Sequence, residues 1–351
     1  MEVGIAFSDA NGFTENLPDL IKNYCRPEYV QKLCRSGQYS PDFVRELDYS
    51  WPGLRAIELQ PEALYRIHGD PNIYSWRWVN LPELPGFDEF FKRCKVVGLH
   101  GPTTDGKSKY PKRRDLSSLD ESHRHWSELE TKEAMSFAHN DLIQAGYFVI
   151  HPGQFDDPEQ HEAKKRQFLK SLDHLFAHYT RNGHRYTICL ENLERPKFPS
   201  SEGEMLEIYE QALAIARKYD LPEDKIRLIF DIPHFCHNVL IDRGFNQKSL
   251  DDVIGEVAGV IERNHGLIYC YHLAGCRKKL DANGKPYFAT HEDIPLIERF
   301  YSAEQWELNL QWILDILNKF PAPIILEVFN LPAKDSRSSV KNVSAYLDKK
   351  R

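Results

Sequence analysis

Six apolar runs of the sequence end in a side chain that can bind a metal ion or transfer a proton. The runs, such as CKVVGLH and APIILE, are typical of strands buried on both faces. Imidazole and carboxylate groups are ligands of zinc, manganese and iron, and they also serve as general acids and bases. The residues at the six ends are His100, His151, Glu191, Asp231 with His234 three positions later, His272 and Glu327.

The ends of the runs recur at a nearly constant spacing. Glu191 follows His151 by 40 residues, Asp231 follows Glu191 by 40, and His272 follows Asp231 by 41. A period near forty residues suits one strand and one long helical connection, the signature of repeated βα units. Because chance would not place so many ligand-type residues in one register, we expect them to form one site.

The segments around these ends complete a set of eight βα units. Val3 to Phe7 is predicted to be the first strand and Ala56 to Leu59 the second, with Glu58 at its end. Apolar residues at helical spacing predict the connections, and Ser249 is the expected N-cap of one of them. The predicted helices are Trp126 to Ala145, Glu159 to Tyr179, Glu204 to Tyr219, one after Ser249, one bearing Leu310 to Leu317, and one after Ser336.

Alternating strands and helices predict an α/β fold with a parallel sheet, and eight units close most economically as a (β/α)8 TIM barrel. We expect one domain over residues 1–351, with an irregular insertion at about 35–85, between the first and third strands, packed near the barrel mouth. Its stretch from Tyr65 to Leu84 is rich in aromatic residues and proline. A barrel brings the strand ends to one mouth, whereas the alternative, an open doubly wound sheet, would spread them along an edge.

Composition narrows the setting in which the protein works. A hydrophobic content of 41% is ample for a folded core, and the formal charge of −7 gives no overall basic footprint for nucleic acid. The seven cysteines form no CxxC pair, which is typical of a reducing compartment. The N-terminus has no signal-peptide pattern, and no run approaches the roughly eighteen apolar residues of a membrane span. We expect a cytoplasmic protein with no membrane association and no obligate protein partner.

Two basic segments lie near the predicted mouth. One follows the third strand and the other follows His272. A run of basic residues is usually a solvated loop, but beside a ligand-bearing strand it could contact phosphate groups. The candidate substrate- or phosphate-binding residues are Lys107, Lys109, Arg113, Arg114, Arg277 and Lys278.

The set of strand-end residues allows two kinds of centre. Two metal ions about 3.5–4 Å apart could activate a water and stabilise both oxygens of a displaced phosphodiester. A single ion held by Glu191, Asp231, His272 and Glu327 could polarise a sugar while the two glutamates exchange protons with its carbon. The second scheme leaves two histidines without a function.

The strand-end motifs resemble the xylose isomerase-like TIM barrels, a superfamily of sugar isomerases and epimerases that also includes the endonuclease IV type of AP endonucleases. The match runs along the whole barrel, is closest to endonuclease IV, and rests on short motifs rather than on continuous sequence. The early GIAFSDANGF also resembles that family's first strand and turn. The motifs are LHGP at His100, IHPG at His151, LEN at Glu191, DIPH at Asp231 and His234, HLAG at His272 and LEV at Glu327.

The resemblance implies a site with two to three divalent ions, most typically zinc or manganese. His100, His151 and Glu191 would hold one ion, and Glu191 would bridge to a second ion held by three further ligands, Asp231, His272 and Glu327. A third ion would take His234 and His291, the latter in YFATHEDIP, where Ala289 replaces the aspartate of the family's D-x-H motif. Glu292, Asp293 or Asp281 could substitute for that aspartate.

Three reactions remain open from the sequence. The first is metal-assisted hydrolysis of a phosphodiester, for instance at abasic DNA. The second is isomerisation or epimerisation of a sugar or sugar phosphate, with Glu191 and Glu327 as the catalytic acid–base pair. The third is an iron-dependent oxidation of a peptide, because the HLAG and TH-x-x-P phrases are similar to DUF692-type multinuclear iron oxygenases. A fourth, non-catalytic possibility is a binding protein with a structural metal.

Overall fold

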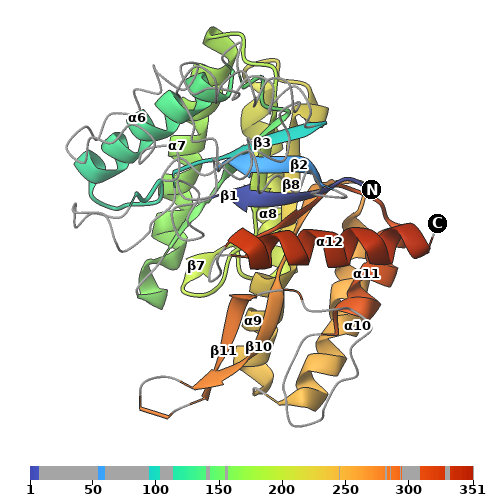
Figure 1. Ribbon diagram of the computed structural model, residues 1–351. Helices are drawn as coiled ribbons and strands as arrows, with labels where there is room; N and C mark the ends of the chain where they lie inside the picture. Colours follow the sequence, from blue (N-terminus) through green and yellow to red (C-terminus); the bar gives the residue numbers. More distant parts are fainter. Residues whose placement is uncertain are drawn as a thin grey trace, which may run out of the picture.

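A closed ring of eight parallel strands forms the centre of the computed structural model (Figure 1). The order around the ring is β1-β12-β9-β8-β6-β4-β3-β2, and every neighbouring pair is parallel. The prediction of a TIM barrel is confirmed, and the open sheet is excluded because β1 pairs with both β2 and β12. The strands are β1 (Val3–Phe7), β2 (Leu54–Leu59), β3 (Val96–His100), β4 (Tyr147–Ile150), β6 (Thr187–Glu191), β8 (Ile226–Asp231), β9 (Ile268–Leu273) and β12 (Ile324–Leu326).

The structure describes the barrel and most of its surrounding helices. The described residues are 1–7, 54–59, 95–102, 114–139, 143–154, 157–244, 246–280, 283–284, 286–292, 294, 309–328 and 333–350. Apart from β2, the predicted insertion at 35–85 lies outside them, and so does the stretch from Tyr65 to Leu84. The position of the insertion over the barrel mouth therefore stays a prediction.

Helices cover the outside of the ring of strands (Figure 1). Their apolar stripes meet the outward faces of the strands; in α10, for example, Val253, Val257 and Ile261 are fully buried. The described helices are α6 (Glu121–Ala138), α7 (His161–Arg181), α8 (Glu202–Arg217), α9 (Ile232–Arg243), α10 (Gln247–Asn264), α11 (Leu310–Lys319) and α12 (Ala333–Lys349). Short 3₁₀ turns at Pro158–Gln160 and Glu223–Lys225 precede α7 and β8.

Several helix boundaries differ from the sequence prediction: α6 ends at Ala138 rather than at Ala145, and α12 begins at Ala333 rather than after Ser336. The helix predicted from Trp126 begins five residues earlier, at Glu121, because Asp120 accepts hydrogen bonds from the first-turn amides. The sequence did not indicate this start, since the first turn of the helix is polar and has no apolar periodicity. Ser249 is not the N-cap of α10. Asn246 is the cap, and its Oδ1 accepts from the Ser249 N–H at 2.9 Å.

The barrel interior is filled by one small layer of side chains directly below the mouth. Along a strand, residues two positions apart face the same side. Six residues of this layer are therefore followed, two positions later, by an inward-facing side chain at the mouth, as Cys189 is by Glu191 and Cys270 by His272. The layer consists of Ala6, Ala56, Tyr147, Val149, Cys189, Ile229, Cys270 and Ile325.

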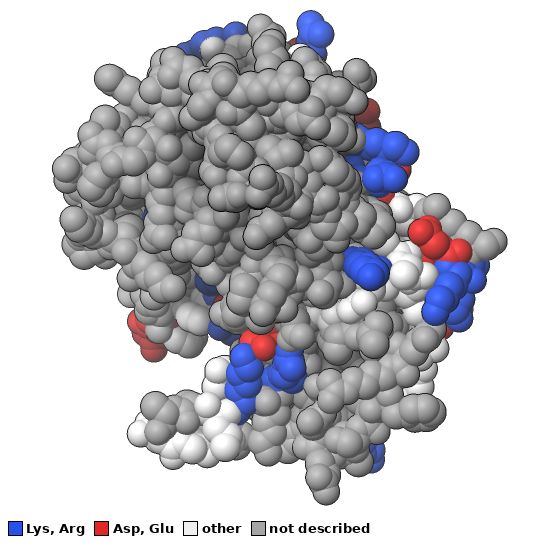
Figure 2. Space-filling view, in the orientation of Figure 1, with Lys and Arg blue, Asp and Glu red and all other residues white. Residues whose placement is uncertain are grey.

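A β-hairpin follows β9 where the regular βα alternation predicts a helical connection. It consists of β10 (Gly275–Leu280) and β11 (Pro286–Glu292), which pair antiparallel and lie beside α9 (Figure 1). Basic and acidic side chains lie next to one another over this hairpin (Figure 2). A smaller antiparallel pair, β5 (Gly153–Gln154) with β7 (Lys197–Phe198), lies in the loops after β4 and β6.

None of the helices in the described ranges is long and apolar enough to span a membrane.

Candidate metal centre

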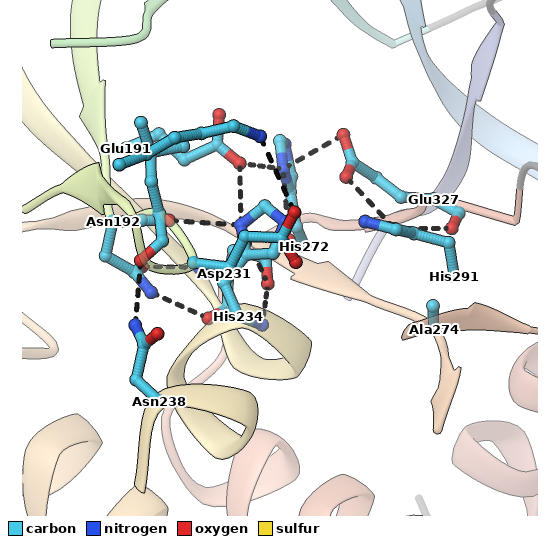
Figure 3. A network of polar contacts seen from close by, with 12 residues as sticks. Glu191, Asn192, Asp231, His234, Asn238, His272, Ala274, His291 and Glu327 are labelled. Atoms are coloured by element: carbon cyan, nitrogen blue, oxygen red, sulfur yellow. Dashed lines mark hydrogen bonds and ion pairs between the residues drawn. The ribbon is translucent and has the colours of Figure 1, made fainter. Parts of the chain in front are cut away.

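Four buried side chains meet at the C-terminal ends of neighbouring strands (Figure 3). Glu191 ends β6, Asp231 ends β8, His272 lies in β9, and Glu327 directly follows β12. One ligand atom from each lies within 4.8 Å of the others. His272 is at the centre, since its Nδ1 lies 3.0 Å from Glu191 Oε1, 3.2 Å from Glu327 Oε1 and 3.9 Å from Asp231 Oδ2. This is the four-residue set that the sequence allows for a single ion.

A second group shares Glu191 with the first. Its Oε2 lies 3.2 Å from His100 Nε2 and 2.8 Å from His151 Nε2, and the three ligand atoms lie within 4.8 Å of one another. The Nδ1 of His100 donates to the Gly101 carbonyl at 2.8 Å, which leaves Nε2 facing the carboxylate. One carboxylate thus has one oxygen toward each group, so the geometry has the bridging arrangement that the resemblance implies.

Glu58 joins the site although the sequence suggested no role for it beyond its place at a strand end. It is fully buried, and its Oε2 lies 3.1 Å from His272 Nε2. With His100 and Glu327 it forms a third group of possible ligand atoms within 4.8 Å of one another. The signal that could have identified it was its register, because β2 places Glu58 two residues after the inner-layer Ala56.

Asp231 both caps a helix and faces the site. Its Oδ1 accepts from the His234 N–H at 2.5 Å, at the start of α9. Its Oδ2 is buried and has no hydrogen-bond partner within the described part of the chain. Asp231 can therefore cap α9 and bind a metal ion at the same time, because each role uses a different oxygen of its carboxylate.

The asparagine of the LEN motif ties two strand ends together. Asn192 donates to the Asp231 carbonyl at 2.8 Å and accepts from the Asp231 N–H at 2.7 Å (Figure 3). Asn238, in the second turn of α9, donates to the Leu193 carbonyl at 2.8 Å. These bonds fix the ends of β6 and β8 against each other, and therefore fix the spacing between the Glu191 and Asp231 carboxylates.

His234 and His291, predicted to share a third ion, lie side by side. Their ring centroids are 5.2 Å apart. The Nδ1 of His234 lies 3.3 Å from the Asn192 carbonyl oxygen, and that of His291 lies 3.2 Å from the Glu327 carbonyl oxygen. The residue at the family's aspartate position, Ala289, is buried.

Of the three substitutes suggested for that aspartate, the structure describes only Glu292. Glu292 pairs instead with Arg277 at 3.4 Å and with Lys279 at 2.5 Å on the hairpin. Asp281 and Asp293 lie outside the described residues. A third ion stays a prediction.

Comparison with known proteins was informative only at the level of structure. No protein-family model matches the sequence, and no curated protein matches it. The chain is similar to a D-tagatose 3-epimerase-like protein, with 15% identity, a TM-score of 0.57 and coverage of 99% of this chain and 98% of the other. It is also similar to a D-psicose 3-epimerase from Clostridium cellulolyticum H10, with 12% identity, a TM-score of 0.51 and coverage of 99% and 95%.

The chain has the fold of the xylose isomerase-like TIM barrels. This fold is the one that the strand-end motifs suggest. Closeness to endonuclease IV within it stays a prediction. In a TIM barrel the active site lies at the C-terminal ends of the strands, which is where the donor groups meet.

At the barrel mouth, the protein's own groups shift the pKa values of two carboxyl groups in opposite directions. Burial raises the pKa of Glu327 to about 7. The nearby Glu191 and Glu58 charges also raise it, whereas the charge of His272 lowers it. Burial also opposes ionisation of Glu191, but His272, His151 and His100 hold its pKa well below the usual range. Two carboxyl groups with opposite shifts in one site are typical of an acid–base pair.

The pKa values of the two histidines in the second group are also shifted in opposite directions. Burial lowers the pKa of His151 to about 4. Burial would also lower that of His100, but the hydrogen bond and charge of Glu191 raise it to about 9. The Glu191 carboxylate therefore needs one positive partner between these rings, and either a proton on His100 or a bound cation can supply it.

The donor set fits a divalent cation. Glu58, Glu191, Asp231 and Glu327 are all at most 3% exposed, and burying a carboxylate is costly unless a positive charge accompanies it. Only three histidines, His100, His151 and His272, face them in the two groups. Imidazole and carboxylate together suit zinc, manganese or iron. Glu191, Asp231, His272 and Glu327 would hold one ion, and His100 and His151 with Glu191 a second.

The structure describes the side chains of two predicted phosphate-binding residues, Arg114 and Arg277, and both pair with acidic residues outside the donor set. Arg114 pairs with Glu130 at 3.3 Å and lies over the Trp126 ring on α6. Arg277 pairs with Glu292 on the hairpin. Lys107, Lys109, Arg113 and the side chain of Lys278 lie outside the described residues. A role for these side chains in binding substrate stays a prediction.

Proposed function

We propose that this protein is a divalent-metal-dependent isomerase or epimerase of a sugar or sugar phosphate, with Glu191 and Glu327 as its acid–base pair. The observation that carries the proposal is the placement of these two carboxyl groups on His272, with pKa values shifted in opposite directions. One structural neighbour is described as a D-tagatose 3-epimerase-like protein and another as a D-psicose 3-epimerase. Of the reactions left open by the sequence, this one has the better support.

The protein's residues can divide the reaction between them. Glu191 is the ionised member and would accept a proton from the sugar carbon, while Glu327, with a pKa of about 7, would hold a proton to return. A bound divalent ion would polarise the carbonyl and hydroxyl oxygens of the sugar. Asp231 and His272, together with the two glutamates, would hold that ion. The fixed spacing of β6 and β8 keeps Glu191 in place relative to Asp231.

Proton exchange with solvent tests this reaction without knowledge of the final product. We expect the manganese- or zinc-loaded protein to incorporate deuterium from D₂O beside the carbonyl of a ketose such as D-tagatose, measured by proton NMR. Glu327→Gln should slow the exchange by about 10²–10⁴-fold, because it removes the proton but keeps the shape of the side chain. Glu128→Gln alters an equally buried glutamate outside the mouth and should retain exchange. Absence of exchange across a panel of ketoses, aldoses and their phosphates would contradict the proposal.

Hydrolysis of a phosphodiester is the second candidate, favoured by one specific observation. His100 and His151 form a group with Glu191 that a single-ion isomerase does not need. A second ion there would stabilise both oxygens of a displaced phosphate. Cleavage of DNA containing an abasic site, in a protein that fails the deuterium test, would favour this candidate.

A further inference from the structure

The two ring nitrogens of His272 face different carboxylates. Nδ1 points to Glu191 and Glu327, whereas Nε2 lies 3.1 Å from Glu58 Oε2 on the opposite side. A neutral imidazole has one N–H and one lone pair, and the group beside one nitrogen decides which form is present. A carboxylate accepts hydrogen bonds and cannot donate them when ionised. Glu58 therefore favours the form with the proton on Nε2 and the lone pair on Nδ1.

The Glu58 carboxylate is itself held in position by a residue of the inner layer. The Tyr147 hydroxyl, in the inner layer of the barrel, donates to the same Oε2 at 2.9 Å. Both side chains are fully buried. The Tyr147 ring can lie over the neighbouring strand β3 because residue 98 is glycine: a Cβ on Gly98 would lie 2.1 Å from Tyr147 Cζ. Four elements of the sequence thus converge on one contact, since β2, β3, β4 and β9 each contribute a residue.

We propose that Glu58 is a positioning residue that fixes His272 with Nε2–H toward itself and the Nδ1 lone pair toward the cation held by Glu191, Asp231 and Glu327. The inference rests on the proposed metal-dependent function and goes beyond it by assigning Glu58 and Tyr147. Metal-bound histidines commonly donate their other N–H to a carboxylate, which orients the ring and raises its basicity as a ligand. Tyr147 acts through Glu58, and Gly98 provides the space.

Direct binding of a cation by Glu58 is the competing interpretation. Its Oε1 has no hydrogen-bond partner among the described residues, and a Glu58 oxygen lies within 4.8 Å of ligand atoms of His100 and Glu327. The Oε2 atom, however, is already between two donors, the Tyr147 hydroxyl and the His272 ring. A positioning role predicts weaker binding of an unchanged number of ions. Direct ligation predicts the loss of one ion.

Cation affinity and stoichiometry separate these roles. We expect Glu58→Gln to weaken Zn²⁺ binding by about 10- to 100-fold, measured by chelator competition, with an unchanged number of ions per chain. Tyr147→Phe should weaken binding by a smaller factor in the same direction. Tyr186→Phe is the matched control, because the Tyr186 hydroxyl donates to the Met135 carbonyl outside the barrel interior, and its affinity should match the unaltered protein.

The ring form can be observed directly in ¹⁵N-histidine-labelled protein loaded with ¹¹³Cd²⁺. We expect cadmium coupling to Nδ1 of His272 and a retained proton on Nε2. Coupling to Nε2, unchanged affinity in Glu58→Gln, or the loss of one ion in that variant would each overturn the proposal. A protein that shows the expected coupling but no deuterium exchange with any sugar would contradict the proposed reaction and leave the role of Glu58 intact.

Discussion

Among single residues, Glu191 is the one that both the four-residue group and the His100–His151 group share. Its Oε1 faces His272 and its Oε2 faces His100 and His151. A carboxylate that bridges in this way can serve one ion or two without a change of backbone. The number of ions then depends on whether His100 and His151 bind an ion together with Glu191. A single substitution can test this.

Removing His151 should reduce the number of bound ions. His151→Ala takes one of two imidazoles from the second group, so we expect elemental mass spectrometry to find about one ion fewer per chain than in the unaltered protein. His174→Ala, which removes a half-exposed histidine on α7, should leave the metal content unchanged. Equal stoichiometry in His151→Ala would instead support a single ion on Glu191, Asp231, His272 and Glu327.

His184 should make the protein sensitive to mild acid. Burial, together with His178 and His139, lowers its pKa to about 4 from the usual 6.5, and neither ring nitrogen has a hydrogen-bond partner within the described residues. Its contribution to stability is therefore full above pH 6.5. As the pH falls from 6.5 toward 4, the unfolded chain binds a proton that the folded chain does not, and the free energy of unfolding decreases by about 1–3 kcal/mol.

Urea unfolding of His184→Phe at several pH values measures this effect. The variant should show a shallower loss of stability between pH 6.5 and 4 than the unaltered protein, because the titrating group is gone. Parallel pH profiles for the two proteins would show that His184 does not titrate differently in the folded state.

The sequence was sufficient to predict most residues of the site but not their partners. His100, His151, Asp231 and His272 were identifiable because each ends an apolar run, and strand register then carries them to one mouth. The pairing of Glu58 with His272 could not be predicted, because those residues are 214 positions apart and meet only when the barrel closes. The pairing of Glu292 with the hairpin bases is another contact that depends on tertiary structure.

At the level of elements, strands were more predictable than helix ends. A buried strand is a continuous apolar run, whereas a helix can begin with a polar turn whose start depends on one capping bond. Ser249 and Asn246 illustrate the difference, because both are good capping residues three positions apart. The hairpin after β9 could not be separated from an irregular loop, since its first strand, GCRKKL, carries consecutive basic residues in place of an apolar run.

The cap of α10 gives a test at this level. Asn246→Ala should lower the free energy of unfolding by about 0.5–2 kcal/mol, because the Ser249 N–H loses its acceptor. Asn246→Asp keeps an oxygen in place and should retain most of the stability. Ser249→Ala keeps the backbone N–H and should cost less than Asn246→Ala. A larger loss for Ser249→Ala in chemical denaturation would show that the cap is wrongly assigned.

For the molecule as a whole, charge is more informative in its distribution than in its sum. The formal charge of −7 does not distinguish between substrates. The burial of four carboxylates at one end of a closed barrel is informative about the site, because such a cluster needs a positive charge beside it. The fold places this cluster where TIM barrels act on their substrates. Shape and charge therefore both support the proposed metal-dependent reaction at the barrel mouth.

Metal content tests this account most directly. After reconstitution with Zn²⁺ or Mn²⁺ and removal of loosely bound ions, elemental mass spectrometry should find at least one divalent ion per chain. The ion should be lost in His272→Ala, whose ring lies at the centre of the donor set. A folded, unaltered protein that retains no ion, or that retains the same number after His272→Ala, would contradict the central claim.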